Sequence, residues 1–212
     1  MTVGQQRAWE RWWPALGRDV AELPDGPLDA AAWFGHAAPL LLEIGSGMGE
    51  GTAAMAAAQP EVNYLAVEVH EPGLAQLIMR ARALGAANLR LLRGDAIPLL
   101  AEHIPAGALA GARIFFPDPW PKKRHHKRRL IQPGFVSLLA SRIARGGTLH
   151  LATDMADYAE QMAQVCAAEP LLRNSHGGWA PRPDWRPVTK FEHRADVQGR
   201  TSRDLIFERV GG

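Results

Sequence analysis

The stretch that decides the fold is EIGSGMGEG, residues 43–51. It continues a short apolar run, PLLLEIG at 39–45, of the kind that forms a buried parallel strand. It leads into GTAAMAAAQ at 51–59, which predicts a helix that ends before Pro60. Its glycines alternate, and glycine permits both a tight turn and a close approach of the backbone to a ligand. The alternating positions are Gly45, Gly47 and Gly49.

The alternation of strand and helix continues along the chain. Further strands are expected at 64–69, 89–96, 112–119, 148–154 and 204–210. Helices are expected between them at 72–86, 133–145 and 155–169. This spacing predicts an α/β, Rossmann-like fold, with an open, mostly parallel sheet and helices on both faces. Ligands of such folds bind beyond the carboxyl ends of the strands.

The residues around the glycine loop favour a cationic ligand over a dinucleotide. The dinucleotide fingerprint G-x-G-x-x-G would place a glycine at position 50, where this chain has Glu50. Glu43 stands just before the first glycine, and a carboxylate there would repel a pyrophosphate. The same carboxylate would attract the sulfonium and amino groups of S-adenosylmethionine. The alternative is an ordinary glycine-rich turn without a ligand.

Three more carboxylates stand at or just beyond expected strand ends. Glu68 closes the second strand 19 residues after Gly49, near the spacing at which Rossmann-like folds bind ribose hydroxyls. Asp95 follows the third strand, where it could meet the adenine edge, and Asp118 follows the fourth. Parallel strands end at one edge of a sheet, so we expect these acids and Glu43 to bind the cofactor there. Any one of them alone could be a helix cap or a surface acid.

A concentrated basic segment directly follows Asp118, in FPDPWPKKRHHKRR at 116–129. Residues 122–129 hold six of the 24 Lys and Arg residues and no acid, whereas the rest of the chain has 18 basic against 22 acidic residues. A chain with a net charge of only +2 therefore has one basic site, which favours a local contact with a polyanion. A solvated loop and a localisation signal are the alternatives. Because the run begins four residues after Asp118, we favour contact with an RNA backbone.

Six motifs occur in an order that resembles a known family. They are EIGSGMGEGT, VEVHEPG, GDA, FPDPWPKKRHHKRR, LATD and TKFE. Together they resemble the bacterial tRNA (guanine-N7)-methyltransferases from about Thr2 to Arg209, and FPDPWPKKRHHKRR is the most specific block. The resemblance implies the class I methyltransferase sheet, with seven strands of which the last is antiparallel. It also implies methyl transfer from S-adenosylmethionine to N7 of the guanine at position 46, in the variable loop of tRNA.

The resemblance further implies roles for individual residues. Glu43, Glu68 and Asp95 match cofactor-contacting carboxylates. Asp118 matches the residue assigned as catalytic and also lies at the cofactor. The residues that match substrate or RNA contacts are Lys122, Arg124, His125, His126, Lys127, Arg128, Arg129, Asp154, Thr189, Lys190, Phe191 and Glu192. One departure is Ser46, at a position where the family usually has an aromatic residue.

The chemistry of guanine N7 limits what the protein must supply. N7 has an in-plane lone pair and no proton, so its methylation has no obligatory base. It needs alignment of N7, the methyl carbon and sulfur, and compensation for the charge that develops on the base. Asp118 suits this role because Pro117 and Pro119 restrict the backbone around it. Asp118 could act on the base or on the cofactor's amino group, Trp120 could stack on the base or pack in its loop, and Asp154 could contact the substrate or cap a helix.

Two other functions compete with this interpretation. Asp-Pro-Trp loosely resembles the signature of enzymes that methylate exocyclic nitrogens, but Trp120 replaces the second proline of that signature. A small-molecule methyltransferase would have little use for the basic run. An RNA-binding module without catalysis is the other alternative, and the acids at four strand ends argue against it.

Composition bounds the remaining properties. A chain of 212 residues with 47% apolar content predicts one domain over 1–212, with a helical segment at 1–37 and a substrate-binding loop region at 177–203. The single cysteine, Cys166, excludes an intramolecular disulfide and a cysteine-rich metal site, and we expect no metal. Without a signal pattern or a continuous apolar run of roughly 18 to 20 residues, we expect no membrane contact and a cytoplasmic location. The choice between monomer and homodimer stays open.

Overall fold

The computed structural model describes residues 1–211, with the side chains of all of them except positions 191, 194 and 195. The described chain divides into two units. Unit 1 consists of residues 1–105 and 185–187, and unit 2 consists of residues 106–184 and 188 onward.

Unit 1 is built on four parallel strands. Their order is β1 (Gly17–Asp19), β4 (Leu89–Arg93), β3 (Asn63–Glu68) and β2 (Leu40–Ile44). Strand β3 is buried along its whole length up to the half-buried Glu68, as expected of a parallel strand covered on both faces. The register pairs Ile44 with Val67, and it pairs Glu68 with Arg93. The carboxyl ends of β2, β3 and β4 therefore share one edge.

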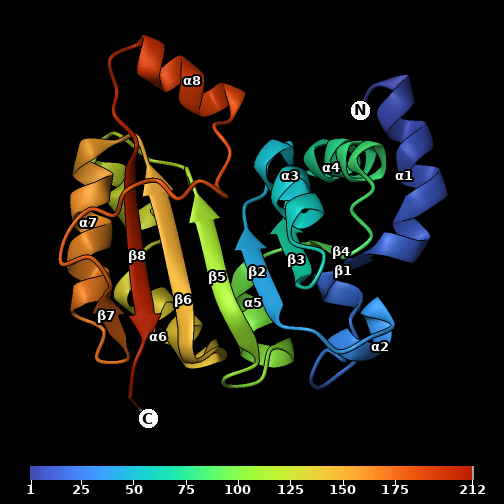
Figure 1. The fold of residues 1–212 in the computed structure, drawn as a ribbon, viewed down its shortest axis with the longest axis horizontal. Helices are drawn as coiled ribbons and strands as arrows, with labels where there is room; N and C mark the ends of the chain where they lie inside the picture. The colour runs from blue at the N-terminus through green and yellow to red at the C-terminus, as the bar shows by residue number, and fades with distance from the viewer. Residues whose placement is uncertain (212) are drawn as a thin grey trace. The chain divides into compact units, whose positions relative to one another are not determined.

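Helices and short turns surround these strands. They are α1 (Val3–Leu16), η1 (Val20–Glu22), α2 (Ala30–Phe34), α3 (Glu50–Ala58), α4 (Glu71–Leu84), α5 (Ala96–Pro98) and η2 (Leu99–His103). Helix α1 begins with a capping box, in which the side chains of Thr2 and Gln5 each accept a bond from the other's backbone N–H. The Gln5 amide also donates to the carbonyl oxygen of Pro72 at 3.3 Å, and α1 lies beside α4 (Figure 1).

Unit 2 combines parallel and antiparallel strands. Their order is β5 (Leu109–Phe115), β6 (Ile143–Thr153), β8 (Arg203–Arg209) and β7 (Leu172–Asn174). Strand β6 runs parallel to β5, whereas β8 runs antiparallel to both β6 and β7. A buried pair joins β6 to β8, with 2.6 Å between His150 Nε2 and Asp204 Oδ1.

The helical elements of unit 2 are η3 (Lys123–Arg128), α6 (Pro133–Arg142), α7 (Ala156–Ala167) and α8 (Lys190–Val197). Helix α7 packs along β7 and β8 (Figure 1). Its buried residues include Tyr158, Met162 and Cys166, which lie on one side of the helix. Residues Gly111 to Phe115 of β5 pair with Thr148 to Ala152 of β6. The carboxyl ends of β5 and β6 therefore lie side by side, and α7 begins just after β6.

The expected α/β fold class is confirmed, including the antiparallel last strand. The described residues contain eight strands where seven were implied. The additional strand is β1, which pairs with β4 over three residues and is too short to give a periodic pattern. The expected domain organisation stays a prediction. None of the described helices is both long enough and apolar enough to cross a membrane.

Several boundaries differ from the expectation: the strands expected at 89–96 and 112–119 are Leu89–Arg93 and Leu109–Phe115, and the strand expected at 148–154 begins at Ile143. The helix expected at 133–145 ends at Arg142, because Ile143 takes an extended conformation and begins β6. Gly146 and Gly147, which suggested a helix end, instead belong to the strand. Gly147 lies against β5, where an added Cβ would stand 2.7 Å from the carbonyl oxygen of Ala110. The glycine is therefore required by the approach of two backbones.

Candidate functional site

The glycine loop joins β2 to α3 in unit 1 and takes a conformation that only glycine adopts readily. Gly45, Gly47 and Gly49 have φ values of +79°, +54° and +69°. An added Cβ at Gly49 would stand 2.5 Å from the side chain of Leu77 on α4. At Gly45 and Gly47 the same position has no described neighbour within 4 Å. One side of the loop is therefore packed on α4, and the other side exposes bare backbone.

Helix α4 also approaches this loop through its own glycine. An added Cβ at Gly73 would stand 2.4 Å from the carbonyl oxygen of Gly47. Any larger residue at position 73 would push the loop away from the helix. The loop geometry thus depends on glycines that lie 26 residues apart in sequence, one in EIGSGMGEGT and the other at the end of VEVHEPG.

Glu68 fixes the glycine loop to the end of β3. Its Oε2 accepts a hydrogen bond from the N–H of Gly47 at 2.8 Å. Its Oε1 accepts from the N–H groups of Val69 and His70 at 2.8 and 2.9 Å. A carboxylate offers about four acceptor positions, so these three bonds leave about one for a ligand hydroxyl. The sequence predicted a bond to both ribose hydroxyls and did not foresee the bond to the loop.

The other acids predicted in unit 1 also lie at this edge of the sheet. Glu43 is on β2 and is only 5% exposed. Asp95 follows β4, is exposed, and caps α5 by accepting from the N–H of Ile97 at 2.8 Å. Ser46, the departure from the family pattern, has a buried hydroxyl that finds no hydrogen-bond partner within residues 1–211. A polar ligand in the loop would give this hydroxyl a partner.

A cavity of about 770 Å³ opens at the ends of β3 and β4. Val69, Gly94 and Asp95 line it, so it extends from the strand ends that carry two of the predicted cofactor acids. Six acidic side chains against one arginine and one histidine make the lining predominantly negative. These residues are Asp19, Glu22, Asp25, Glu71, Asp95, Glu102, Arg93 and His103. Of the predicted cofactor residues only Asp95 lines this cavity, whereas the glycine loop, Glu43 and Glu68 do not. The charge of the lining fits a cationic ligand and not a pyrophosphate.

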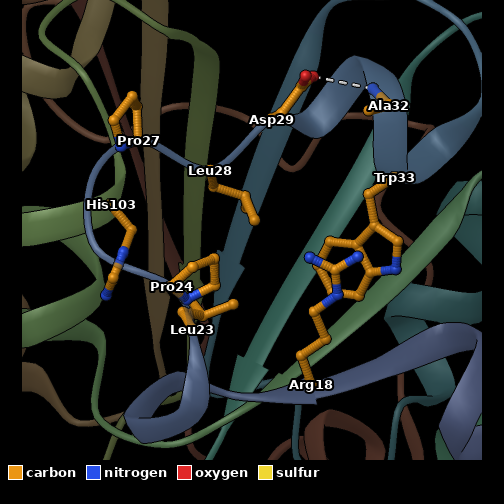
Figure 2. A pocket seen from close by; sticks show the side chains of 9 residues that line it. All are labelled: Arg18, Leu23, Pro24, Pro27, Leu28, Asp29, Ala32, Trp33 and His103. Atoms are coloured by element: carbon orange, nitrogen blue, oxygen red, sulfur yellow. Dashed lines mark hydrogen bonds between the residues drawn. The ribbon is translucent and has the colours of Figure 1, made fainter.

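Unit 1 has a second, smaller cavity of about 240 Å³ (Figure 2). Its wall includes Arg18, whose guanidinium carbon lies 4.4 Å from the ring centroid of Trp33. His103 lines both cavities, and its Nδ1 lies 3.0 Å from the carbonyl oxygen of Gly26. None of the residues predicted from the sequence lines this smaller cavity.

In unit 2, the sequence FPDPW forms a turn directly after β5. Phe116 and Trp120 both have positive φ, at 51° and 43°, which is uncommon for residues other than glycine. The N–H of Phe116 donates to the carbonyl oxygen of Ala152 on β6 at 2.7 Å. Asp118 lies between these two residues and its side chain is exposed. The turn thus presents one carboxylate on a constrained backbone.

The basic run after this turn is folded. Residues 123–128 form the 3-10 helix η3, in which Lys123, Arg124 and Lys127 are exposed, and Lys122 is exposed just before it. Trp120 is enclosed by this helix. The guanidinium carbon of Arg128 lies 5.0 Å from its ring centroid, and the ring of His125 meets it edge-on at 5.9 Å. Trp120 is thus half-buried against its own loop, and its stacking on the base stays a prediction.

Arg129 differs from the rest of the run. The sequence analysis grouped it with the RNA contacts, but its side chain is only 1% exposed. It donates to the carbonyl oxygen of Pro119, to Gln161 and to Asp157. Burial alone would raise the pKa of the Asp157 carboxyl, but the hydrogen bond and charge of Arg129 bring this pKa below its ordinary value. Arg129 is therefore satisfied within the protein.

The remaining predicted substrate residues have local partners. Asp154, buried at the end of β6, accepts from Arg200 Nε at 2.7 Å. Thr189 caps α8 by accepting from the N–H of Glu192 at 3.2 Å. Glu192 is buried and Lys190 is exposed. Phe191 belongs to α8, and its side chain lies outside the described residues.

Two other kinds of site receive no support from the described part of the chain. Residues 1–211 contain no group of three or more His, Cys, Asp or Glu side chains that could hold a metal ion. Cys166 is buried, and burial, with a smaller effect of Glu169, raises the pKa of its thiol to about 12. Such a thiol is a poor nucleophile.

Comparison with known proteins relates the chain to methyltransferases. Residues 37–205 match the model of a family described as "Putative methyltransferase". The chain is 52% identical to the tRNA (guanine-N(7)-)-methyltransferase of Nocardia farcinica, covering 99% of this chain and 81% of that protein. It is 51% identical to the protein of the same name from Paracidovorax citrulli, covering 99% and 83%.

Solved structures are similar in fold. The 30S ribosomal A1408 methyltransferase from an uncultured bacterium gives a TM-score of 0.60 at 11% identity, covering 85% of this chain and 92% of that one. The 16S rRNA methyltransferase KamB gives a TM-score of 0.58 at 15% identity, covering 92% and 99%. At these identities the likeness concerns the fold alone.

Proposed function

The chain belongs to the family of tRNA (guanine-N(7)-)-methyltransferases, and we propose that it methylates N7 of the guanine at position 46 in the variable loop of tRNA. We place this activity in the cytoplasm. The observation that carries the proposal is the turn at Asp118. An exposed carboxylate is held between two prolines, and an exposed basic helix follows it at once. A binding module without chemistry has no need of the carboxylate, and a small-molecule enzyme has no need of the helix.

We assign the cofactor to unit 1. S-adenosylmethionine would supply a methyl group on a positively charged sulfur. The exposed backbone of Gly45 and Gly47 is open to it, and Glu43, Glu68 and Asp95 are the carboxylates that would hold it. Glu68 keeps the loop in place and has room for about one ligand hydroxyl. The buried hydroxyl of Ser46 is a further candidate contact.

We assign the chemistry at the base to Asp118 in unit 2. Because guanine N7 has no proton to lose, the protein's work is to orient the base and to balance the positive charge that develops on it. A carboxylate on a constrained turn does both, either by facing the charged base or by accepting from its N1 and N2 hydrogens. The target base must also be accessible, and displacing it is expected to cost a few kcal/mol.

We assign the RNA backbone to Lys122, Lys123, Arg124 and Lys127, which are exposed on and beside η3. His125, His126 and Arg128 belong to the same helix and are secondary contacts. Phosphate contacts of this kind position a nucleic acid without reading its sequence. The choice of one guanine then depends on where the tRNA body is held, which suits a target defined by its place in a folded RNA.

The direct test uses unmodified tRNA and cofactor labelled in the methyl group. After incubation the RNA is digested and the labelled nucleoside is identified. We expect 7-methylguanosine, and we expect it to disappear when the tRNA has adenine at position 46. Label in any other nucleoside would refute the proposed reaction. Label in 7-methylguanosine that persists in the adenine-46 tRNA would refute the position alone.

A further inference from the structure

We propose that Arg129 is a positioning residue that holds the Asp118 turn in its working conformation, and that it does not contact RNA. The proposal rests on the function assigned above to Asp118. It separates Arg129 from the five other basic residues of the run, which the sequence alone cannot distinguish from it.

Arg129 holds the peptide that follows Asp118. Its Nε donates to the carbonyl oxygen of Pro119 at 2.8 Å. Pro119 directly follows Asp118, so this bond ties down the peptide next to the carboxylate. The flanking residues Phe116 and Trp120 have positive φ, an unfavourable conformation that persists only when the surroundings impose it. A buried guanidinium bonded between these two positions is such a constraint.

Arg129 is itself held by residues of α7. Its other nitrogens donate to Gln161 at 2.9 Å and to Asp157, which stand one turn apart on α7. Its guanidinium carbon lies 4.6 Å from the ring centroid of Tyr158, on the same helix. Gln161 and Tyr158 in turn bond the backbone of Ile131 at 3.0 and 3.2 Å. The Arg129 guanidinium thereby connects the Asp118 turn to α7, because its planar group donates several hydrogen bonds in fixed directions.

The charge and burial of Arg129 also argue against a contact with RNA. A cation that contacts phosphate must reach solvent, and the Arg129 side chain is 1% exposed. Its charge is already balanced by Asp157. The cluster also senses Asp118: burial is the main cause of the raised pKa of Tyr158, and the negative charge of Asp118 contributes in the same direction. Arg129 therefore bonds the peptide next to Asp118 while its own side chain is buried and paired within unit 2.

The test exploits the fact that an acidic side chain cannot be a phosphate contact. We compare Arg129→Gln, Asp157→Asn and Arg124→Gln, the last being an exposed residue of the same run. We measure kcat, KM for tRNA, and the slope of log affinity against log salt. For Arg129→Gln and Asp157→Asn we expect kcat to fall by about 100-fold, with KM and slope unchanged. For Arg124→Gln we expect the slope to decrease by roughly 0.7 to 0.9 and KM for tRNA to rise.

Two further variants complete the design. Because Arg129 and Asp157 act through one bond, the double variant should lose no more than the stronger single variant. Arg129→Lys keeps the positive charge but lacks the planar guanidinium. Its kcat should therefore lie between those of the unmodified protein and Arg129→Gln. Cofactor binding by calorimetry and far-UV circular dichroism verify that each variant is folded. If Arg129→Gln does not fold, Asp157→Asn, whose side chain is about half exposed, carries the test.

The outcomes separate this proposal from the proposed function. An unmodified chain that forms no 7-methylguanosine would refute the proposed function itself. If the unmodified chain is active, normal kcat in Asp157→Asn or a reduced salt slope in Arg129→Gln would overturn the positioning role. A changed slope in Arg129→Gln would return Arg129 to the RNA contacts.

Discussion

Carboxylates at strand ends look alike in the sequence, but the backbone around them gives each a different task. Glu68 accepts three backbone N–H bonds and so stabilises the loop that forms the cofactor site. Asp95 caps a short helix with one of its oxygens. Asp118 is exposed, and Arg129 stabilises its turn by bonding the neighbouring carbonyl oxygen of Pro119. A carboxylate that accepts backbone hydrogen bonds mainly stabilises local structure, whereas an exposed carboxylate is available for chemistry.

The first residue-scale prediction concerns Asp118. We expect Asp118→Asn to lower kcat by about 10² to 10³, because the charge that balances the developing cation is lost while the shape is kept. Single-turnover methylation of tRNA measures the effect. Calorimetry with the cofactor then decides the open choice of role: unchanged affinity assigns Asp118 to the base, and weakened affinity assigns it to the cofactor. Near-normal turnover would remove Asp118 from the mechanism.

The second residue-scale prediction concerns Glu68. The Glu68 carboxylate now accepts hydrogen bonds from backbone N–H groups on both of its oxygens. In Glu68→Gln one oxygen is replaced by an NH₂ group, which cannot accept such a bond, so the loop would be displaced. Hydrogen bonds to charged groups are worth about 1.5 to 3 kcal/mol, and we expect cofactor affinity to fall by about 10- to 100-fold. Calorimetry measures this, with Glu61→Gln as the matched control, since Glu61 is exposed just before the amino end of β3, opposite the end that carries Glu68. Equal losses in both variants would argue against a specific role of Glu68.

At the scale of elements, the basic run forms a 3-10 helix of six residues, which is about two turns. Lys123, Arg124, Lys127 and Arg128 are exposed, Arg128 also lies over Trp120, and Arg129 is buried after the helix ends. Proline on either side of Asp118 prevents the turn from continuing β5. The element that binds phosphate and the element that carries the carboxylate are thus adjacent pieces of one fold.

The prediction for this element is a change in salt dependence. Replacing Arg124 and Lys127 together by glutamine should reduce the slope of log affinity for tRNA against log salt by roughly 1.4 to 1.8, because two phosphate contacts are lost. Filter binding between 50 and 200 mM salt is sufficient to measure it. Arg145→Gln is the control, since Arg145 is exposed at the amino end of β6, opposite the end that carries Asp154. An unchanged slope would make the run a solvated helix without a role in binding.

At the scale of the whole molecule, charge is unevenly distributed. The net charge is +2, yet outside residues 122–129 acidic residues outnumber basic ones by 22 to 18. The large cavity of unit 1 has a predominantly acidic lining, and the exposed basic helix belongs to unit 2. A cationic cofactor and an anionic RNA are therefore attracted to different parts of the chain.

The sole cysteine gives a prediction about unfolding. Cys166 is buried on α7 and the pKa of its thiol is raised from 9.0 to about 12. We expect no reaction with a thiol reagent at pH 8 until the protein unfolds, so the labelling rate in urea should follow the loss of circular dichroism. Because the unfolded thiol ionises first, this group should destabilise the fold as pH rises from 9.0 towards about 12. Rapid labelling of the native protein would contradict the buried position, and Cys166→Ser controls for other reactive groups.

The sequence by itself determined what depends on neighbours along the chain. The alternation of apolar runs and helices gave the α/β class, and the glycines after Ile44 predicted a ligand loop because backbone preferences act within a few residues. The acids at strand ends followed from the same local pattern. The short strands β1 and β7 have no counterpart among the strand ranges expected from the sequence, because three residues have no measurable period.

Only the tertiary structure decided which partner each polar side chain takes. Arg129 stands in a row of similar residues, and it becomes the buried one because Asp157 and Gln161, 28 and 32 residues later, meet it on one side of α7. Gly73 is required because α4 reaches the backbone of Gly47. Such contacts join residues far apart in sequence, where burial and geometry select one among several equivalent side chains. Local pattern can therefore identify a functional segment, while the fold assigns the work within it.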